Sequence, residues 1–268
     1  MKDYLLELLA KHADHNVKLN MAREYLQAYA LRALYNSGMF RTTAFLGGTA
    51  LRFFYDLPRF SQDLDFSIME NPKYSFEDIL KKIKSEFILG GYNADVSYNE
   101  KQAVQSAFLK FHDLMYEAGM SPHKNQILSI KIEIDSKPPS GAVSETRIIN
   151  KYFPIAFLSY DLPSLFAGKL HAILSRKYIK GRDYFDLAWY LSKWTDISPN
   201  FILLENSLIQ TGWKGEMPNK KIWRVLIREK IKKTDWKAVN DDVKNFLENP
   251  ADMKVFSKEN ILLLLEKK

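Results

Sequence analysis

Cysteine is absent from the 268 residues of this chain. Its absence excludes disulfide bonds, iron–sulfur clusters, thiolate zinc sites and a cysteine nucleophile. Long apolar runs are also missing, because the longest purely aliphatic stretch, Ile261 to Leu265, is far shorter than the ~20 residues of a membrane-spanning helix. The N-terminus is charged from Lys2 onward and lacks a signal-peptide pattern. We therefore expect a cytoplasmic protein with no membrane partner.

Positive charge is in excess, with 39 Lys and Arg against 32 Asp and Glu and a net charge of +7. The basic residues gather in three groups, at 81–84, 176–182 and 220–233, and the third group contains Trp223. Basic residues interleaved with aromatic ones suit a phosphate backbone and unstacked bases. The alternative is an amphipathic helix with a solvated basic face and its tryptophan in the core. The charge thus fits a nucleic-acid partner without requiring one.

The spacing of apolar residues divides the chain into a mixed half and a helical half. In the first half, helices are expected at 17–36, 49–55 and 75–89. The strands expected there are 43–46, 63–68, 94–98, 104–111, 127–135 and 146–149. After Pro163 the expected helices are 164–177, 182–194, 199–211, 218–232, 239–248 and 257–266. The pattern predicts an α+β fold, with a small mixed sheet in residues 1–155 and an all-helical domain in residues 156–268.

Two aspartates stand out on the expected strand 63–68. Asp63 and Asp65 are two residues apart, so both side chains leave the same face of the strand, while Leu64 and Phe66 point toward the core. Like charges on one face repel each other unless a cation lies between them. Mg²⁺ suits this position, because it prefers carboxylate oxygens and keeps coordination sites for water and phosphate.

A double glycine precedes these aspartates, and a second acidic strand follows them. Gly47 and Gly48 let the backbone approach a phosphate closely, at the start of the helix that begins near Thr49. In the strand 127–135, Lys131, Glu133 and Asp135 share one face. If this strand lies beside Asp63 and Asp65, Glu133 or Asp135 completes a three-carboxylate site that can activate a hydroxyl for attack on phosphorus. The alternative is a strand with an ordinary solvated face.

Four segments, read together, resemble one protein family. The double-glycine turn GGTALR at 47–52 and FSQDLDF at 60–66 are similar to the DNA polymerase β-like nucleotidyltransferases, and more narrowly to the AbiEii/AbiGii toxins of bacterial abortive-infection and toxin–antitoxin systems. LPSLFAGKLHA at 162–172 is similar to that family's K-x-x-A motif. RDYFDL at 182–187 is similar to its R-D-x-x-D-L motif. The resemblance implies a polymerase β-like catalytic half followed by helices that complete the active site and bind the acceptor.

The resemblance also implies roles for residues of the helical half. Lys169 lies among apolar residues on a helix, where a lysine needs an anion, and the family makes it a ligand of the nucleotide phosphates. Asp183 is implied as an active-site acid, and Arg182 and Asp186 as nucleotide-binding residues. The alternative is that these last three residues form a capping and salt-bridge cluster that fixes one helix to another.

These expectations combine into one hypothesis, a Mg²⁺-dependent nucleotidyltransferase that uses an NTP and releases pyrophosphate. The resemblance implies a toxin that modifies a cellular acceptor such as the tRNA 3′ end and is neutralised by a cognate antitoxin protein. The expected catalytic residues are Asp63, Asp65, Glu133, Asp135, Lys169 and Asp183, with Asp63, Asp65 and Glu133 on the metal. The expected nucleotide-binding residues are Gly47, Gly48, Thr49, Arg52, Lys169, Arg182 and Asp186. The alternatives are a metal-dependent ribonuclease and a non-catalytic nucleic-acid-binding protein.

Overall fold

The computed structural model of this chain describes residues 1–69 and 75–266. The chain forms two compact units, each assembled from more than one segment. The first unit, called the sheet unit below, comprises Met1–Tyr55, Phe60–Pro138 and Thr146–Ser159. The second, called the helical unit, comprises Asp56–Arg59, Pro139–Glu145 and Tyr160–Lys268. The functional division into residues 1–155 and 156–268 stays a prediction.

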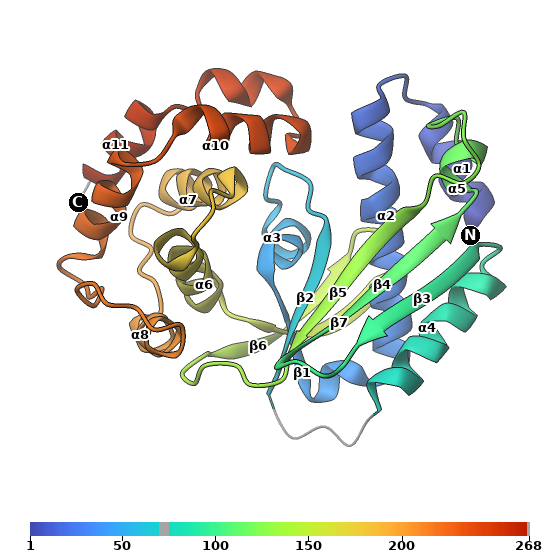
Figure 1. Ribbon diagram of the computed structural model, residues 1–268, viewed down its shortest axis with the longest axis horizontal. Helices are drawn as coiled ribbons and strands as arrows, with labels where there is room; N and C mark the ends of the chain where they lie inside the picture. Colours follow the sequence, from blue (N-terminus) through green and yellow to red (C-terminus); the bar gives the residue numbers. More distant parts are fainter. Residues whose placement is uncertain (70–74, 267–268) are drawn as a thin grey trace. The chain divides into compact units, whose positions relative to one another are not determined.

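Seven strands of the described residues form one mixed sheet in the order β3-β4-β5-β2-β1-β7-β6 (Figure 1). Their bounds are β1 Thr43–Leu46, β2 Asp63–Ile68, β3 Asn93–Asn99, β4 Val104–His112, β5 Leu128–Asp135, β6 Ser144–Asn150 and β7 Pro154–Tyr160. Strand β2 pairs antiparallel with β1 and parallel with β5, and β1 pairs parallel with β7. The strand that carries the two aspartates therefore lies in the interior of the sheet.

The helices of the sheet unit cover its apolar side chains. They are α1 Lys2–Ala10, α2 His15–Asn36, α3 Gly47–Tyr55, α4 Phe76–Leu89 and α5 Leu114–Glu117, with a 3₁₀ turn at Met39–Arg41. Helices α2 and α4 pack against each other and against the sheet (Figure 1). Capping side chains mark where these two helices begin, since Asp14 accepts from the N–H of Val17 and Ser75 from that of Asp78. The rings of Phe45, Phe66 and Phe157 pack together in the core.

The helical unit is built from α6 Leu162–Ser175, α7 Gly181–Lys193, α8 Phe201–Gln210, α9 Trp223–Lys232, α10 Trp236–Val243 and α11 Lys258–Glu266. Two 3₁₀ turns, Lys244–Phe246 and Pro250–Lys254, connect α10 to α11. Helix α6 begins where Asp161 caps the N–H of Ser164 and a proline occupies the first turn. Its Phe166 stacks on Tyr190 of α7 and meets the edge of Trp223 on α9, so aromatic rings form the centre of this unit.

The expected α+β class is confirmed, and most predicted elements agree with the structure within a few residues. Three elements were missed, the helices α1 and α5 and the strand β7. Strand β7 buries Ile155, Phe157 and Ser159 on one face, a period of two that is partly hidden because the other face carries Ala156 and Leu158. Helix α9 begins at Trp223 rather than at 218, so the prediction of its start was wrong. None of the described helices has both the length and the apolar character needed to cross a membrane.

Candidate active site

The sheet brings acidic side chains of β2 and β5 together. The parallel register sets Asp63 beside Lys131 and Asp65 beside Glu133. Paired residues of adjacent strands lie about 4.8 Å apart and point to the same face. All four are half-buried, whereas Leu64 between the aspartates is fully buried. Three carboxylates and one ammonium group therefore share one small area of the sheet.

Lys131 provides positive charge on this carboxylate face. Its Nζ lies 2.7 Å from Oε1 of Glu133. The hydrogen bond with Glu133 raises the pKa of Lys131; burial opposes the shift, and the charges of Glu133, Asp63 and Asp65 add to it. The lysine is thus held in its charged form by the surrounding carboxylates. Lys131 was expected on this face of the strand without a role, although the alternation of lysine and glutamate in the sequence was a usable signal.

Asp135 lies one step further along β5, beside Ser67. Its Oδ1 accepts a hydrogen bond of 2.9 Å from the backbone N–H of Lys137. Burial raises the pKa of Asp135, and that hydrogen bond only partly opposes the shift. Of the two acids left open by the sequence, Glu133 is therefore the one in direct register with Asp65.

The double-glycine turn fits closely around Asp65. Gly47 is the first residue of α3, directly after β1, and its φ of +80° lies in the left-handed region. A Cβ at this position would collide with Oδ2 of Asp65. Thr49, which is fully buried, donates its hydroxyl to the carbonyl of Asp63. The glycine makes room for one carboxylate, and the threonine fixes α3 to the strand that carries both.

Arg52 was expected near the nucleotide, and the structure places it in the interior of the sheet unit. It is 4% exposed, its Nε donates to Glu24 of α2, and its guanidinium lies 4.3 Å from the ring centroid of Phe60. Tyr152 and Lys151 also reach the carboxylate of Glu24, at 3.1 and 3.2 Å. This environment favours a structural role for Arg52, and nucleotide binding by it stays a prediction.

The carboxylate face is suited to a divalent metal ion. Asp63 and Asp65 supply hard oxygen donors, and the missing side chain of Gly47 leaves room for the carboxylate of Asp65. Within residues 1–69 and 75–266, no three acidic or histidine side chains already converge as a complete metal shell. Mg²⁺ does not require one, because it commonly binds one or two carboxylates together with water and substrate phosphates. The residues present therefore fit the ion.

In the helical unit, Lys169 and Asp186 join a buried ion network between α6 and α7. Nζ of Lys169 lies 2.6 Å from Oδ2 of Asp186 and 3.1 Å from Oδ1 of Asp183. Nε and Nη2 of Arg59 donate hydrogen bonds to Oδ1 and Oδ2 of Asp186, both of 2.6 Å. Burial of Asp186, which is 0% exposed, would raise its pKa, but the charges of Arg59 and Lys169 prevail and lower it. This carboxylate is ionised and fully paired.

The other two predicted residues of the helical unit lie around the start of α7. Asp183 is 3% exposed and has Nε of Arg176 3.6 Å from its Oδ2. Nε of Arg182 lies 3.3 Å from Oδ2 of Asp242, and the same oxygen accepts a hydrogen bond from the backbone N–H of Arg182. The structure therefore joins Lys169, Asp183 and Asp186 in one network and gives Arg182 a separate partner. Their nucleotide-binding and catalytic roles stay predictions.

The arrangement of β1, α3 and β2 in the sheet unit agrees with the class of protein that the sequence resembles. A strand, a glycine turn, a short helix and a strand with two aspartates on one face form the core of the polymerase β-like nucleotidyltransferases resembled by the sequence. Residues 29–258 match the family model described as nucleotidyl transferase AbiEii toxin, type IV TA system. The chain belongs to this family of type IV toxin–antitoxin nucleotidyl transferases, which confirms the resemblance drawn from the four segments.

Solved structures share the fold. One is JHP933 from Helicobacter pylori, with 18% identity and a TM-score of 0.54, covering 92% of this chain and 88% of the other. A second, described as a candidate nucleotidyltransferase from H. pylori, has 19% identity and a TM-score of 0.54, with 91% and 89% covered. Among curated proteins, none matches the chain. The structural likeness extends over both units and concerns the fold.

Proposed function

We propose that this chain is the toxin of a toxin–antitoxin pair in the cytoplasm and that it transfers a nucleotide from an NTP to an RNA acceptor, the tRNA 3′ end. The observation that carries the proposal is the register of β2 and β5, which sets Glu133 beside Asp65 on the face that also bears Asp63. Family membership supports both the transfer chemistry and a cognate antitoxin.

The chain's own residues divide the chemistry among them. Asp63 and Asp65 would hold Mg²⁺, which when bound neutralises phosphate charge and favours loss of pyrophosphate. Glu133 takes the proton of the acceptor hydroxyl while the hydroxyl oxygen bonds to the α-phosphorus and the bond to pyrophosphate breaks. Backbone N–H groups at the start of α3, beside Asp65, would donate to phosphate oxygens.

Lys169 is proposed as a ligand of the triphosphate. Its ammonium group can exchange a carboxylate for a phosphate oxygen without stranding a buried charge, because Asp186 keeps two hydrogen bonds from Arg59. Asp183 keeps Arg176, 3.6 Å away. If Lys169 leaves, Asp186 therefore stays hydrogen-bonded and Asp183 keeps the ion pair with Arg176.

The test is label transfer. Wild type is incubated with tRNA, Mg²⁺ and each α-³²P-labelled NTP in turn, and the RNA is resolved on a sequencing gel. We expect one or more NTPs to lengthen the RNA, and Asp65→Asn to abolish the reaction while its circular dichroism spectrum and thermal midpoint match wild type. Equal, background-level labelling by wild type and Asp65→Asn would overturn the transfer activity. Shortening of the RNA without NTP would instead establish a ribonuclease.

A further inference from the structure

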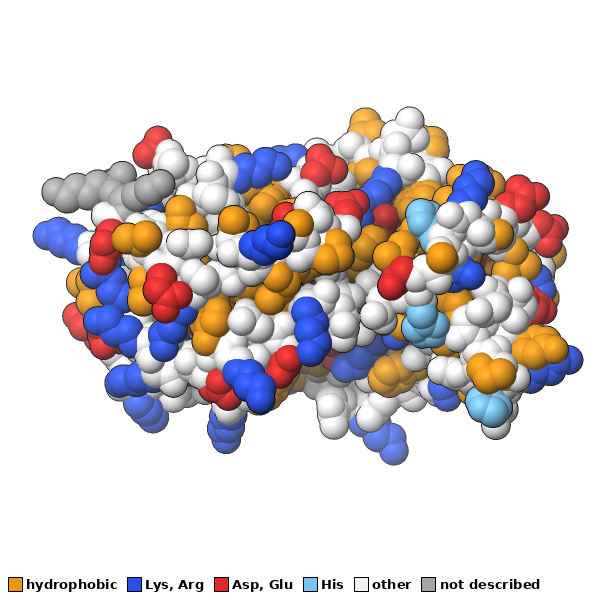
Figure 2. Space-filling model, turned by 90° about the horizontal axis from the view of Figure 1, so that it is seen from above, with side chains coloured by type: hydrophobic (Ala, Val, Ile, Leu, Met, Phe, Trp, Pro, Cys, Tyr) orange, Lys and Arg blue, Asp and Glu red, His pale blue; other side chains and the backbone are white. Residues whose placement is uncertain are grey.

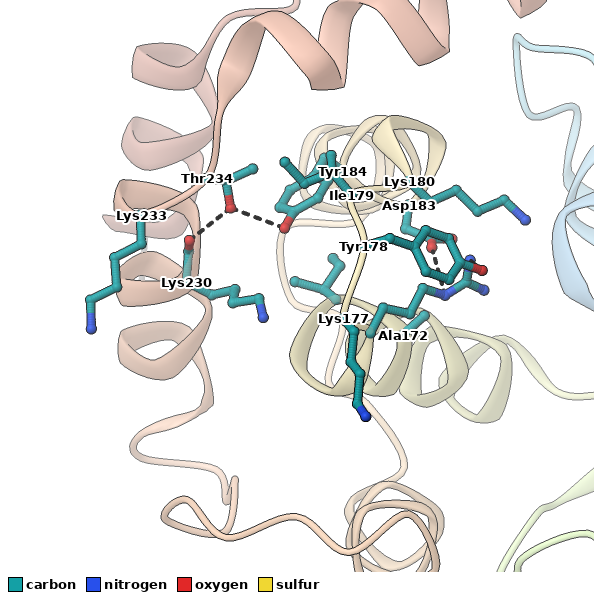
Figure 3. Close-up of a pocket in the computed structure, with 12 residues that line it drawn as sticks. Ala172, Lys177, Tyr178, Ile179, Lys180, Asp183, Tyr184, Lys230, Lys233 and Thr234 are labelled. Atoms are coloured by element: carbon teal, nitrogen blue, oxygen red, sulfur yellow. Dashed lines mark hydrogen bonds and ion pairs between the residues drawn. The ribbon is translucent and has the colours of Figure 1, made fainter.

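The helical unit contains a cavity that borders the Lys169 network through Asp183 and Arg176, and the proposed chemistry assigns no ligand to it. It has a volume of about 250 Å³ and is enclosed by α6, the segment from Arg176 to Lys180, α7 and α9 (Figure 3). On one side, Tyr184 and Thr234 form a hydrogen bond of 3.1 Å, and the threonine hydroxyl donates onward to the carbonyl of Lys230. The hydroxyl groups on this side of the cavity are therefore already hydrogen-bonded within the protein.

The residues around this cavity are strongly basic. Five Lys and Arg side chains line it, Arg176, Lys177, Lys180, Lys230 and Lys233, against the single carboxylate of Asp183. Figure 3 shows the amino groups of Lys177, Lys180 and Lys233 pointing away from the cavity in three different directions, and we call these residues its rim, while Lys230 reaches from α9 toward α6. On the face drawn in Figure 2, basic and acidic side chains are interspersed. The rim therefore stands out by its local excess of positive charge.

Three of these lysines lack a direct partner. Among the described residues, the side chains of Lys177, Lys180 and Lys233 form no hydrogen bond and no ion pair, although the charge of Asp183 acts on Lys180 and that of Glu229 on Lys233. Lys180 is half-buried, and burial lowers its pKa, an effect that Asp183 only partly opposes. An ammonium group held partly out of water without a partner costs free energy, which a bound anion would offset.

An exposed aromatic ring lies in the same rim. Tyr178 is 67% exposed, and the guanidinium of Arg176 holds it from one side, 5.5 Å from the ring centroid and within 3.2 Å of the hydroxyl. A large ring held in solvent by a cation is an available stacking surface. Cations beside such a ring match the two parts of a single-stranded nucleic acid, its phosphates and its bases.

We propose that this rim binds single-stranded RNA, with Lys177, Lys180 and Lys233 on the phosphate backbone and Tyr178 stacked on a base. The cavity is smaller than the ~300–1,000 Å³ of sites that enclose a drug-sized molecule, so it takes a phosphate and part of a sugar rather than a whole nucleoside triphosphate. This inference rests on the proposed function in one respect, that the acceptor is RNA.

The experiment measures binding alone. Fluorescence anisotropy follows a labelled single-stranded RNA oligonucleotide ending in CCA over a series of salt concentrations, without Mg²⁺ or NTP. We expect the double variant Lys177→Gln/Lys180→Gln to bind about tenfold more weakly, with the slope of log K against log salt shallower by about 1.4, the change expected for two lost phosphate contacts. Tyr178→Ala should weaken binding about tenfold, and Tyr178→Phe should restore it, since stacking needs only the ring.

The matched control is Lys237→Gln/Lys254→Gln, which removes the same charge from two exposed lysines of the helical unit that do not line the cavity. An equal loss of affinity in the control would show that the RNA is attracted by the overall positive charge of the protein, and it would overturn the proposal. Displacement of the RNA from wild type by a mixture of NTPs at low concentration would assign the cavity to nucleotide and also overturn it. A wild type that binds RNA through this rim but transfers no label would refute the proposed function alone.

Discussion

The carboxylate face of the sheet unit and the Asp186 network of the helical unit differ in how their acidic side chains are compensated. In the sheet unit, Asp63 and Asp65 share an open, half-buried face with Glu133, and Lys131 is bound to the glutamate. In the helical unit, Asp186 is completely buried and paired with two cations. The carboxylate face thus has negative charge in excess over positive charge, whereas the charge of Asp186 is matched by its two cations.

This difference separates a candidate binding site from an ion network that stabilises the fold. A buried charge is tolerated only when partners compensate for its desolvation. The folded helical unit therefore needs Arg59 and Lys169 as partners of Asp186. Carboxylates gathered on an open face are not needed for folding and repel one another, so their proximity indicates a cation to be bound. Substitutions in the two places should therefore affect different measurements.

The largest effect on stability is expected for Asp186→Asn. The change leaves Arg59 and Lys169 facing a neutral amide inside the unit, and removing one partner of a buried pair typically costs about 3–5 kcal/mol. Chemical denaturation followed by circular dichroism should show a markedly lower midpoint. Asp63→Asn should leave the midpoint unchanged or raise it, because it relieves repulsion. A loss of stability in Asp63→Asn similar to that in Asp186→Asn would erase the contrast between the units.

The control for Asp186→Asn is Asp241→Asn, which removes an exposed carboxylate paired with Lys244 and should not change the midpoint measurably. The network also predicts a pH dependence. The pKa of Asp186 is lowered from 3.8, so its stabilisation is fully present above pH 3.8 and is lost as the pH falls through the lower pKa of the folded state. Wild type should therefore lose more stability than Asp186→Asn on acidification below pH 3.8.

The second prediction concerns the third carboxylate of the sheet unit. Glu133→Gln should lower the rate of label transfer about 100-fold, the lower end of what a general base contributes, because Glu133 is in register with Asp65. Asp135→Asn, beside Ser67, is the matched change two residues along the same strand and should have little effect. The reverse order of the two variants would move the proton acceptor to Asp135.

Local sequence patterns were enough to predict the strands of the site and the faces of their side chains. The alternation at 63–68 and 127–135 depends on neighbours two residues apart, and both strands form with Leu64 and Ile132 buried. The register that sets Asp65 beside Glu133 joins residues far apart in the chain, and no local period encodes it. This is why the sequence left Glu133 and Asp135 as alternatives.

Contacts between residues far apart in the chain also explain why the positions of two arginines could not be predicted. Arg52 was expected among the nucleotide-binding residues, and Arg59 follows it in the segment between the glycine turn and Asp63. Their partners, Glu24 and Asp186, lie 28 and 127 residues away in the chain. Both side chains are buried against those partners. Spacing alone cannot distinguish an arginine that waits for a ligand from one already paired with a distant carboxylate.

The third prediction tests the fit between the turn and Asp65. Gly47→Ala should cost about 1–2 kcal/mol, the usual penalty for a side chain in the left-handed region, and should also lower transfer about tenfold, because its Cβ displaces the Asp65 carboxylate. Gly212→Ala is the control, since Gly212 has a φ of +74° and no atom within 4 Å of an added Cβ. It should lose similar stability and keep its activity. Equal activity in the two variants would show that Asp65 does not depend on the turn.

The smallest expected effect belongs to Lys131, the cation on the open face. If its ammonium group stands where positive charge is needed before a metal ion binds, Lys131→Gln should remove a competitor and lower the Mg²⁺ concentration for half-maximal transfer roughly two- to fivefold, the range of one partly exposed ion pair. Lys84→Gln, which breaks an exposed pair with Asp95, should leave the Mg²⁺ requirement unchanged. An unchanged Mg²⁺ requirement with a collapse of the maximal rate would instead place Lys131 on the substrate, and the surplus of carboxylates on this face would then be smaller than the contrast with Asp186 implies.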